Sequence, residues 1–235
     1  MNDKTDEPFI RDLIGKEKFL DAAEIIVENI SVANYTDYLR NILQLPKFSP
    51  SAIHEAVFRI DPKVVITTNY DDIYDNYCKL GASANGYNIC RHNETHLVSD
   101  LRSTYRSIVK AHGCISNIAN TILTRSQFFE ARLKYSNFYK ILDSLFLTNT
   151  ILFIGYSMTD PDIQLVLENS HISAIGSHPH YACLADNMNP TLKRVMHKTY
   201  NIELIEFQAG NFAQLETGLR DLANDVESYR LTNPL

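Results

Sequence analysis

Three short polar motifs in this sequence each follow an apolar stretch that is typical of a buried strand. The first contains Asn69 and Asp71, directly after the run Val64–Thr67. An amide both donates and accepts hydrogen bonds, so Asn69 could hold a hydroxyl group or position a water molecule, and the Asp71 carboxylate could accept from a ligand. The same residue types also cap helices. The motif alone does not separate the two interpretations.

The second motif is the pair His112-Gly113, which follows the stretch Ser107–Ala111. An imidazole titrates near neutral pH, so His112 could act as a general base. Gly113 allows a positive φ or a close approach of the backbone to a ligand. A single histidine is often structural, but a position at the same sheet edge as Asn69 favours a functional role.

The third motif, Gly155-Tyr156-Ser157, precedes a helix that begins near Asp160. Gly155 could let a phosphate or a ribose approach, the Ser157 hydroxyl could bind it, and the free amides at the start of the helix favour anions. The chain has no G-x-G-x-x-G sequence, so the ordinary dinucleotide fingerprint is absent. The alternative is a purely structural strand–turn–helix corner, in which Ser157 and Asp160 cap the helix.

Alternating strands and helices are expected to carry these motifs. The sequence predicts helices over residues 13–30, 35–45, 51–60, 136–148, 162–168, 190–200 and 211–229, and a further helix opened by Asp71 and Asp72. It predicts strands over 64–67, 107–111, 150–154, 180–184 and 202–207. Such alternation implies right-handed crossovers and a parallel sheet, in which ligands bind beyond the carboxyl ends of the strands.

The predicted fold is therefore α/β, with a Rossmann-like, mainly parallel sheet, helices on both faces and an N-terminal helical segment. We expect a single domain over residues 1–235. Residues 1–61 would form helices near the mouth of the pocket, and residues 62–235 would form the core. Asn69, Asp71, His112, Gly155 and Ser157 would then line one crevice.

Composition excludes several classes of function. The net charge of −6 and the scattered Lys and Arg residues argue against direct binding of nucleic acid, which needs clustered positive charge. No apolar run approaches the roughly 20 residues that cross a bilayer, and the polar N-terminus does not look like a secretory signal. We expect a cytoplasmic protein without membrane contact.

The cysteines predict no metal site. Cys78, Cys90, Cys114 and Cys183 form no C-x-x-C pair, so a structural zinc ion is not expected. Cys90 is close in sequence to His92 and His96, which could suggest one corner of a metal site. A loop with solvated histidines is the preferred interpretation of that stretch.

Together the three motifs resemble the SIR2-like (sirtuin-like) family, especially its bacterial branch linked to anti-phage defence by abortive infection. The matching stretches are Ile66–Asp71, Val109–Gly113 and Leu152–Asp162, and the similarity extends over roughly Val64–Phe207. The order and the spacing of the motifs both agree with the family pattern.

The resemblance implies roles for individual residues. In sirtuins the first motif reads Gln-Asn-Ile-Asp, and its Asn and Asp contact the nicotinamide ribose and the carboxamide of NAD. These roles would belong to Asn69 and Asp71, with Thr68 in place of the Gln, and His112 would be the catalytic histidine. Gly155, Tyr156, Ser157 and Asp160 would complete the NAD-binding residues, and Ala185–Asn187 is a weak match to the adenosine contact.

The resemblance therefore implies an NAD hydrolase that cleaves the nicotinamide–ribose bond and releases nicotinamide and ADP-ribose. Sirtuin deacylases usually carry a four-cysteine zinc module, and its absence disfavours an NAD-dependent protein deacylase and favours plain hydrolysis. NAD would be the substrate, and no zinc is expected. A homo-oligomer and a partner effector or sensor protein both remain open.

One departure from the family pattern concerns the diphosphate of NAD. The family begins with a strand and a Gly-Ala-Gly-x-Ser-type loop, and nothing similar precedes Val64; Gly15 stands alone in a helical pattern. We expect this chain by itself to turn over NAD weakly or not at all. A module that binds NAD or ADP-ribose as a sensor, and a scaffold that keeps only the fold, are the alternatives.

Overall fold

The computed structural model describes residues 6–81 and 86–233. The chain forms two compact units. The first unit comprises Met1–His54 and Asp61–Ser136, and the second comprises Glu55–Ile60 and Asn137–Leu235.

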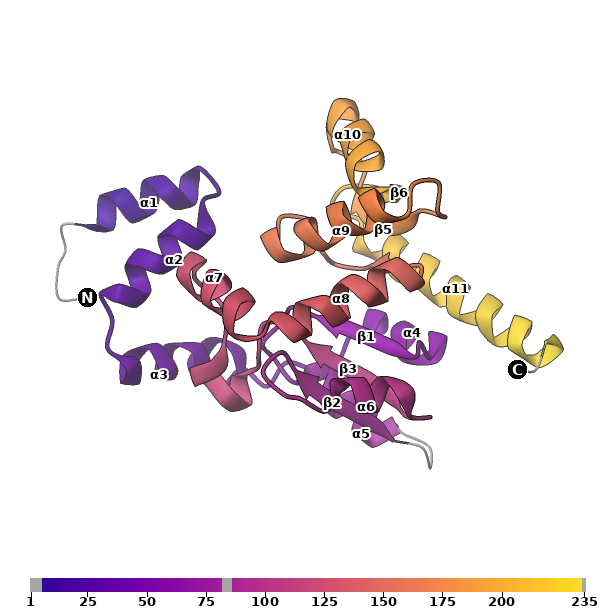
Figure 1. Ribbon diagram of the computed structural model, residues 1–235, viewed down its shortest axis with the longest axis horizontal. Helices are drawn as coiled ribbons and strands as arrows, with labels where there is room; N and C mark the ends of the chain where they lie inside the picture. The colour runs from indigo at the N-terminus through magenta and orange to yellow at the C-terminus, as the bar shows by residue number, and fades with distance from the viewer. Residues whose placement is uncertain (1–5, 82–85, 234–235) are drawn as a thin grey trace. The chain divides into compact units, whose positions relative to one another are not determined.

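The first unit begins with three helices, α1 (Glu7–Gly15), α2 (Phe19–Glu28) and α3 (Val32–Leu43) (Figure 1). The helical pattern of residues 13–30 is interrupted because Gly15 ends α1 and Glu17 adopts a positive φ of 59°. A small apolar core joins α1 to α2; its buried members are Ile10, Leu13 and Ala22. Ser31 caps the start of α3, and its Oγ accepts a hydrogen bond from the Asn34 amide at 3.3 Å.

A three-stranded parallel sheet forms the centre of the first unit. Its strands are β1 (Val64–Thr67), β2 (Tyr87–Arg91) and β3 (Arg106–Lys110), in the order β1-β3-β2. Lys110 is in register with Thr67 on one side and with Arg91 on the other. The sheet is accompanied by helices α5 (Ile73–Gly81) and α6 (Leu97–Arg102). Because the strands are parallel, the segments that follow them all leave the same edge.

The rest of the first unit follows β3. A 3-10 helix, η2 (Ile115–Asn120), packs on α3 through Leu39, Ile115 and Ile118. Helix α7 (Arg125–Lys134) begins with a capping box, in which Thr124 Oγ1 accepts from the Gln127 amide and the Gln127 side chain accepts from the Thr124 amide. The N-terminal helices thus contact the chain that follows His112.

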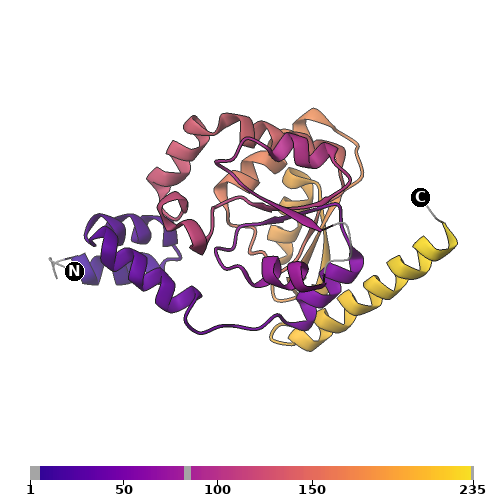
Figure 2. The same cartoon turned by 90° about the horizontal axis from the view of Figure 1, so that it is seen from below.

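The second unit contains a second three-stranded parallel sheet, in the order β4-β5-β6. Its strands are β4 (Leu152–Phe153), β5 (His180–Ala185) and β6 (Ile202–Phe207). Its helices are α8 (Ser136–Thr148), α9 (Pro161–Ser173), α10 (Pro190–Tyr200) and α11 (Phe212–Thr232). Of helix α4 (Ala52–Ile60), the residues Glu55–Ile60 belong to this unit. Helix α11 is long and unbroken (Figure 2), and its Glu227 forms an ion pair with Arg59 of α4 at 2.8 Å.

The architecture confirms the predicted α/β class, with parallel sheets flanked by helices and a helical N-terminal segment. The expected loop around Cys90 is wrong, because Tyr87–Arg91 forms strand β2. The described residues contain two sheets of three strands each, whereas the sequence predicted five strands in all. The organisation of residues 1–235 as a single domain remains a prediction. In the described ranges, no helix combines the length and the apolar character that a membrane span requires.

Candidate functional site

The first motif lies in the loop that connects β1 to α5. The side chain of Asn69 is exposed, and its backbone amide donates to Thr67 Oγ1 at 3.1 Å. Thr68 is half-buried. Asp71 Oδ1 accepts from the Ile73 amide at 3.0 Å, so this carboxylate caps α5. Asp71 therefore acts as a helix cap, as the alternative interpretation expected. The Asn69 side chain makes no hydrogen bond with residues 6–81 and 86–233.

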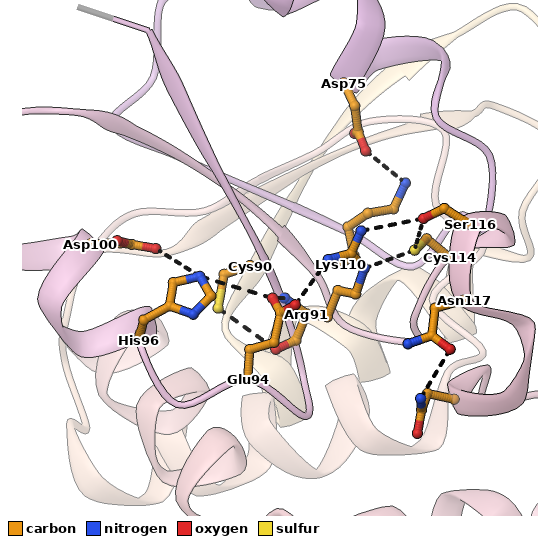
Figure 3. Close-up of polar contacts among 11 residues, drawn as sticks. Asp75, Cys90, Arg91, Glu94, His96, Asp100, Lys110, Cys114, Ser116 and Asn117 are labelled. Carbon is orange, nitrogen blue, oxygen red and sulfur yellow. Dashed lines mark hydrogen bonds and ion pairs between the residues drawn. The ribbon is translucent and has the colours of Figure 1, made fainter.

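A buried lysine holds this loop against the central strand. Lys110, at the end of β3, is fully buried, and its Nζ donates to Asp75 Oδ2 at 3.1 Å (Figure 3). It also donates to Asp72 Oδ1 at 3.0 Å. The same ammonium also donates to the backbone carbonyl of Asp71. Burial raises the pKa of Asp75 above its ordinary value, and the Lys110 ammonium opposes that rise. Lys110 thus ties the carboxyl end of β3 to the loop that carries Asn69.

Sequence reasoning did not identify this ion pair. The available signal was a lysine at the end of an otherwise apolar strand, together with three aspartates within the eight positions that follow β1. A fully buried ammonium needs carboxylate partners, because leaving water costs it several kcal/mol. The strand assignment and the acidic cluster together could have predicted the pairing.

His112 follows β3 at the same sheet edge. The Ala111 amide donates to the Thr67 carbonyl at 2.9 Å, which extends the β1–β3 pairing one residue towards both motifs. The His112 side chain is only 6% exposed. Its ring meets Phe128 edge to face, with centroids 4.8 Å apart. His112 is therefore on the edge that the sequence predicted, but it is more buried than a residue at an open pocket mouth.

A second histidine accompanies His112. Burial lowers the pKa of His92 to about 4, and the nearby His112 ring contributes to the decrease. The His92 ring packs edge to face on Tyr135, with centroids 5.1 Å apart. The sequence-based view of His92 as a solvated histidine is wrong, since its side chain is 3% exposed. At neutral pH His92 is uncharged.

Gly113 has the positive φ that the sequence allowed, at 83°. A Cβ atom at this position would lie 2.5 Å from the Asn120 carbonyl oxygen. The backbone approach at Gly113 is thus an approach to the η2 segment of the same chain. Tyr70 fixes the same region, because its hydroxyl donates to the Ile122 carbonyl at 2.6 Å and its carbonyl accepts from the Ile115 amide at 2.7 Å.

Arg91 connects the end of β2 to the segment after His112. Its Nε donates to Cys114 Sγ at 2.9 Å, and its other nitrogens contact Glu94 at 2.9 Å and Ser116 at 3.3 Å (Figure 3). The hydrogen bond to Cys114, followed by the contact with Glu94, raises the pKa of Arg91. All three strands of this sheet therefore end in polar contacts that fix the loops at the edge.

His54 is a further histidine near this edge that the sequence did not single out. Its Nδ1 accepts from the Ser51 amide at 3.0 Å. Burial lowers the pKa of His54, and the Asp71 carboxylate is close enough to oppose the decrease. The signal in the sequence was weak, because Ser51-x-x-His54 reads only as the start of a helix.

The third motif lies in the second unit, after β4. Gly155 adopts a positive φ of 63°, and both Gly155 and Ser157 are exposed. Ser157 Oγ lies 2.7 Å from Thr159 Oγ1. Asp160 Oδ1 accepts from the amides of Asp162 and Ile163 at 2.9 and 3.2 Å, so Asp160 caps α9 as the alternative interpretation expected.

Tyr156, between these two exposed residues, turns inwards. Its ring packs on Phe153 with centroids 5.5 Å apart, and burial raises the pKa of its hydroxyl. After β5, the Asp186 carboxylate accepts from the Ala209 amide at 3.0 Å. Gly155 and the Ala185–Asn187 segment both follow strands of the second sheet, which are parallel.

The predicted site residues thus fall into two sets. Thr68, Asn69, Asp71 and His112 share the carboxyl edge of the first sheet. Gly155, Tyr156, Ser157 and Asp160 follow β4 in the second unit. That all of them line one crevice remains a prediction.

Known proteins place these observations in a family. The family model described as "SIR2-like domain" matches residues 63–205. Two proteins named NAD(+) hydrolase ThsA are similar to the chain: the Acinetobacter baumannii protein is 24% identical over 144 residues, and the Enterococcus faecium protein is 27% identical over 144 residues. Defense-associated sirtuin 2 of Bacillus subtilis is 28% identical over 133 residues.

These alignments cover more than half of the chain but a small part of each relative. They include 60%, 59% and 55% of this chain, and 28%, 30% and 12% of the respective relatives. All three of the polar motifs lie within the 63–205 match. The chain belongs to the family of SIR2-like domains.

Proposed function

We propose that this domain hydrolyses NAD at the bond between nicotinamide and ribose, in defence against phage. The observation that carries the proposal is the placement of Asn69, Asp71 and His112 at one edge of a parallel sheet, inside a SIR2-like domain. Relatives that are named NAD(+) hydrolases and a defence-associated sirtuin support the substrate and the setting. We place the protein in the cytoplasm.

In this proposal the exposed Asn69 amide orients the ribose or the attacking water. The water oxygen bonds to C1′ of the ribose while the bond from C1′ to nicotinamide breaks. Nicotinamide leaves as a neutral molecule, because its ring nitrogen takes the bonding electron pair. Charge builds up on the ribose as in other glycosidic cleavages, so correct placement of the water contributes much of the rate.

His112 accepts the proton that the water loses, as a general base. Its burial against Phe128 holds the ring in one orientation. Asp71 uses one carboxylate oxygen to cap α5, and its second oxygen remains to accept from the carboxamide. Thr68 contributes to NAD binding at the same edge of the first sheet. The family resemblance assigns the phosphate and ribose side of NAD to Gly155, Tyr156, Ser157 and Asp160.

The direct test is nicotinamide release from NAD, measured by liquid chromatography with the purified chain and with its Asn69→Ala variant. We expect Asn69→Ala to abolish turnover while far-UV circular dichroism stays unchanged, because the Asn69 side chain is exposed. Asn76→Ala, at an exposed position on α5, is the matched control and should keep activity. Measurable NAD consumption that is equal in the wild type and in a folded Asn69→Ala protein would end the catalytic interpretation.

A non-hydrolysing sensor of NAD or ADP-ribose is the second candidate. It is favoured by the capping roles of Asp71 and Asp160, which occupy carboxylate oxygens with backbone amides. Isothermal titration with ADP-ribose separates the two functions: a sensor binds ADP-ribose and releases no nicotinamide. A chain that binds neither nucleotide would be a scaffold. Release of deacylated peptide from an acyl-lysine substrate would identify a deacylase.

Assembly is a further part of the proposal. The chain spans no more than 30% of the length of the three relatives, so the activity of a complete protein can depend on segments outside the aligned region. We propose that a homo-oligomer or a partner effector or sensor protein activates the domain. Turnover that rises with protein concentration more steeply than in direct proportion would support self-assembly.

A further inference from the structure

We propose that Cys90, His96 and Asp100 bind a zinc-class divalent cation. This site is separate from the residues assigned to NAD and does not depend on hydrolysis. The sequence disfavoured a metal in this stretch because only Cys90 and two histidines were apparent. The fold changes the donor set: it brings Asp100 to the cluster and buries His92 elsewhere, against Tyr135.

Strand β2 and the start of helix α6 supply the donor atoms. Cys90 lies on β2, His96 directly precedes α6, and Asp100 lies in the first turn of α6. The cysteine Sγ, an imidazole nitrogen and a carboxylate oxygen all lie within 4.8 Å of one another. Figure 3 shows the three side chains directed towards one another. Two adjacent segments of the chain thus converge on one point.

The distance between His96 and Asp100 fits two ligands of a tetrahedral ion. His96 Nε2 lies 3.4 Å from Asp100 Oδ2. Two ligands of a tetrahedral zinc ion, each about 2.1 Å from the metal, are about 3.4 Å apart. A sulfur and a nitrogen ligand would be about 3.6 Å apart. The Cys90 sulfur, at 4.8 Å or less, therefore needs to move by about 1.2 Å at most.

The surroundings of Asp100 suit a metal ligand. Its Oδ1 accepts from the Asn88 amide at 3.0 Å, which fixes the carboxylate. Its Oδ2 is buried and receives no hydrogen bond from the described residues. A buried carboxylate oxygen normally has a partner, and an ion between Oδ2 and His96 Nε2 would be one. Asn88 would then act as the outer hydrogen bond that orients a metal ligand.

The chemistry of the donors selects the metal. A thiolate and an imidazole prefer zinc and related soft or borderline ions, whereas Mg²⁺ and Ca²⁺ prefer oxygen ligands. Cys90 must lose its proton to bind, so uptake of the ion releases a proton to the solvent. The His96 side chain is 49% exposed, which provides an entry path and leaves a fourth position for water. Glu94, whose carboxylate lies 3.9 Å from His96 Nε2, is beside this position.

The test measures metal binding directly. Untagged full chain is treated with a chelator, dialysed, and titrated with Zn²⁺ by calorimetry in buffers of different ionisation enthalpy. We expect one ion per chain with release of a proton. Co²⁺ in place of Zn²⁺ should give a thiolate-to-cobalt charge-transfer band. A wild-type chain that binds neither ion above the level of the His96→Ala variant would overturn the proposal.

Variants assign the ligands. His96→Ala and Asp100→Asn should each weaken Zn²⁺ binding by more than about 100-fold, and Asn88→Ala by about 10–100-fold, the range for outer hydrogen-bond partners. His178→Ala, at an exposed position in the second unit, should bind as the wild type does. Cys90→Ser should remove the charge-transfer band. If burial of the new hydroxyl prevents folding of Cys90→Ser, the His96→Ala variant takes its place. The charge-transfer band should be lost in His96→Ala, and its persistence there would refute the site.

Discussion

The buried ion pair between Lys110 and Asp75 provides the sharpest test of how the first unit holds its loop. Replacing Lys110 with Met removes an ammonium that is 3.1 Å from Asp75 Oδ2 and fully buried. Coulomb's law gives about 5 kcal/mol for that distance at an effective dielectric constant of about 20. Breaking a buried pair by removing one partner costs about 3–5 kcal/mol, because the other charge is left without compensation. We expect Lys110→Met to lose that amount of unfolding free energy.

The pH dependence gives the prediction a second arm. Burial already raises the pKa of Asp75, and without Lys110 this pKa should rise further. A raised pKa in the folded protein means that the fold favours the protonated carboxyl. The free energy of unfolding therefore falls as the pH rises above the pKa of this group in the unfolded chain, which is about 4. The deficit of Lys110→Met relative to the wild type should therefore be larger at pH 8 than at pH 5. A deficit that is constant over this range would contradict the assignment.

The assay is urea unfolding followed by tyrosine fluorescence and far-UV circular dichroism, since the chain has 13 Tyr and no Trp. Lys193→Met is the matched control, because Lys193 pairs with Glu206 and is 25% exposed; it should cost less than about 1 kcal/mol. The double variant Lys110→Met/Asp75→Leu should recover most of the loss, because apolar replacement of a buried pair is often neutral. A Lys110→Met variant as stable as Lys193→Met would refute the reasoning.

Three further predictions concern single side chains. Gly113→Ala should lose at least about 2 kcal/mol of unfolding free energy, because its φ is 83° and the new Cβ would meet a backbone oxygen at 2.5 Å; a urea midpoint equal to the wild type would exclude this. His92, whose pKa is lowered to about 4, should cost the wild type up to about 3 kcal/mol of stability as pH falls from about 6.5 to 4, because only the unfolded chain gains the proton. The loss in that window should be smaller in His92→Gln, and equal slopes would contradict it. Asp160→Ala should destabilise by about 1 kcal/mol through loss of the α9 cap, as thermal unfolding would measure; rescue by Asp160→Asn, another good capping residue, would show that the cap is the cause.

The elements that sequence predicted well are those with a strong local pattern. Residues 136–148 and 190–200 form α8 and α10, and residues 202–207 form β6, all with the expected bounds. Pro190 at a helix start and the apolar run of β6 are local signals, so no distant contact is needed to recognise them. The positive φ of Gly113 was anticipated for the same reason.

The features that escaped the sequence depend on contacts between distant residues. Strand β2 alternates polar and apolar side chains only weakly, and its Asn88 and Arg91 are used in hydrogen bonds to Asp100 and Cys114. Local propensity therefore favoured a loop, whereas pairing with β3 makes it a strand. The burial of His112 likewise results from packing on Phe128, 16 positions later, which no spacing rule reveals.

The polar groups of the three motifs differ in how far the fold already employs them. Asp71 and Asp160 cap helices, and the Tyr70 hydroxyl donates to a backbone carbonyl, so each variant at these positions changes both folding and any chemistry. Asn69 is different, because its side chain is exposed and the hydrogen bond at this residue is made by the backbone. An amide held at a sheet edge without a structural task costs nothing to remove from the fold. Loss of NAD turnover in a fully stable Asn69→Ala protein would therefore report chemistry alone, whereas a loss in His112→Ala must first be corrected for the packing on Phe128.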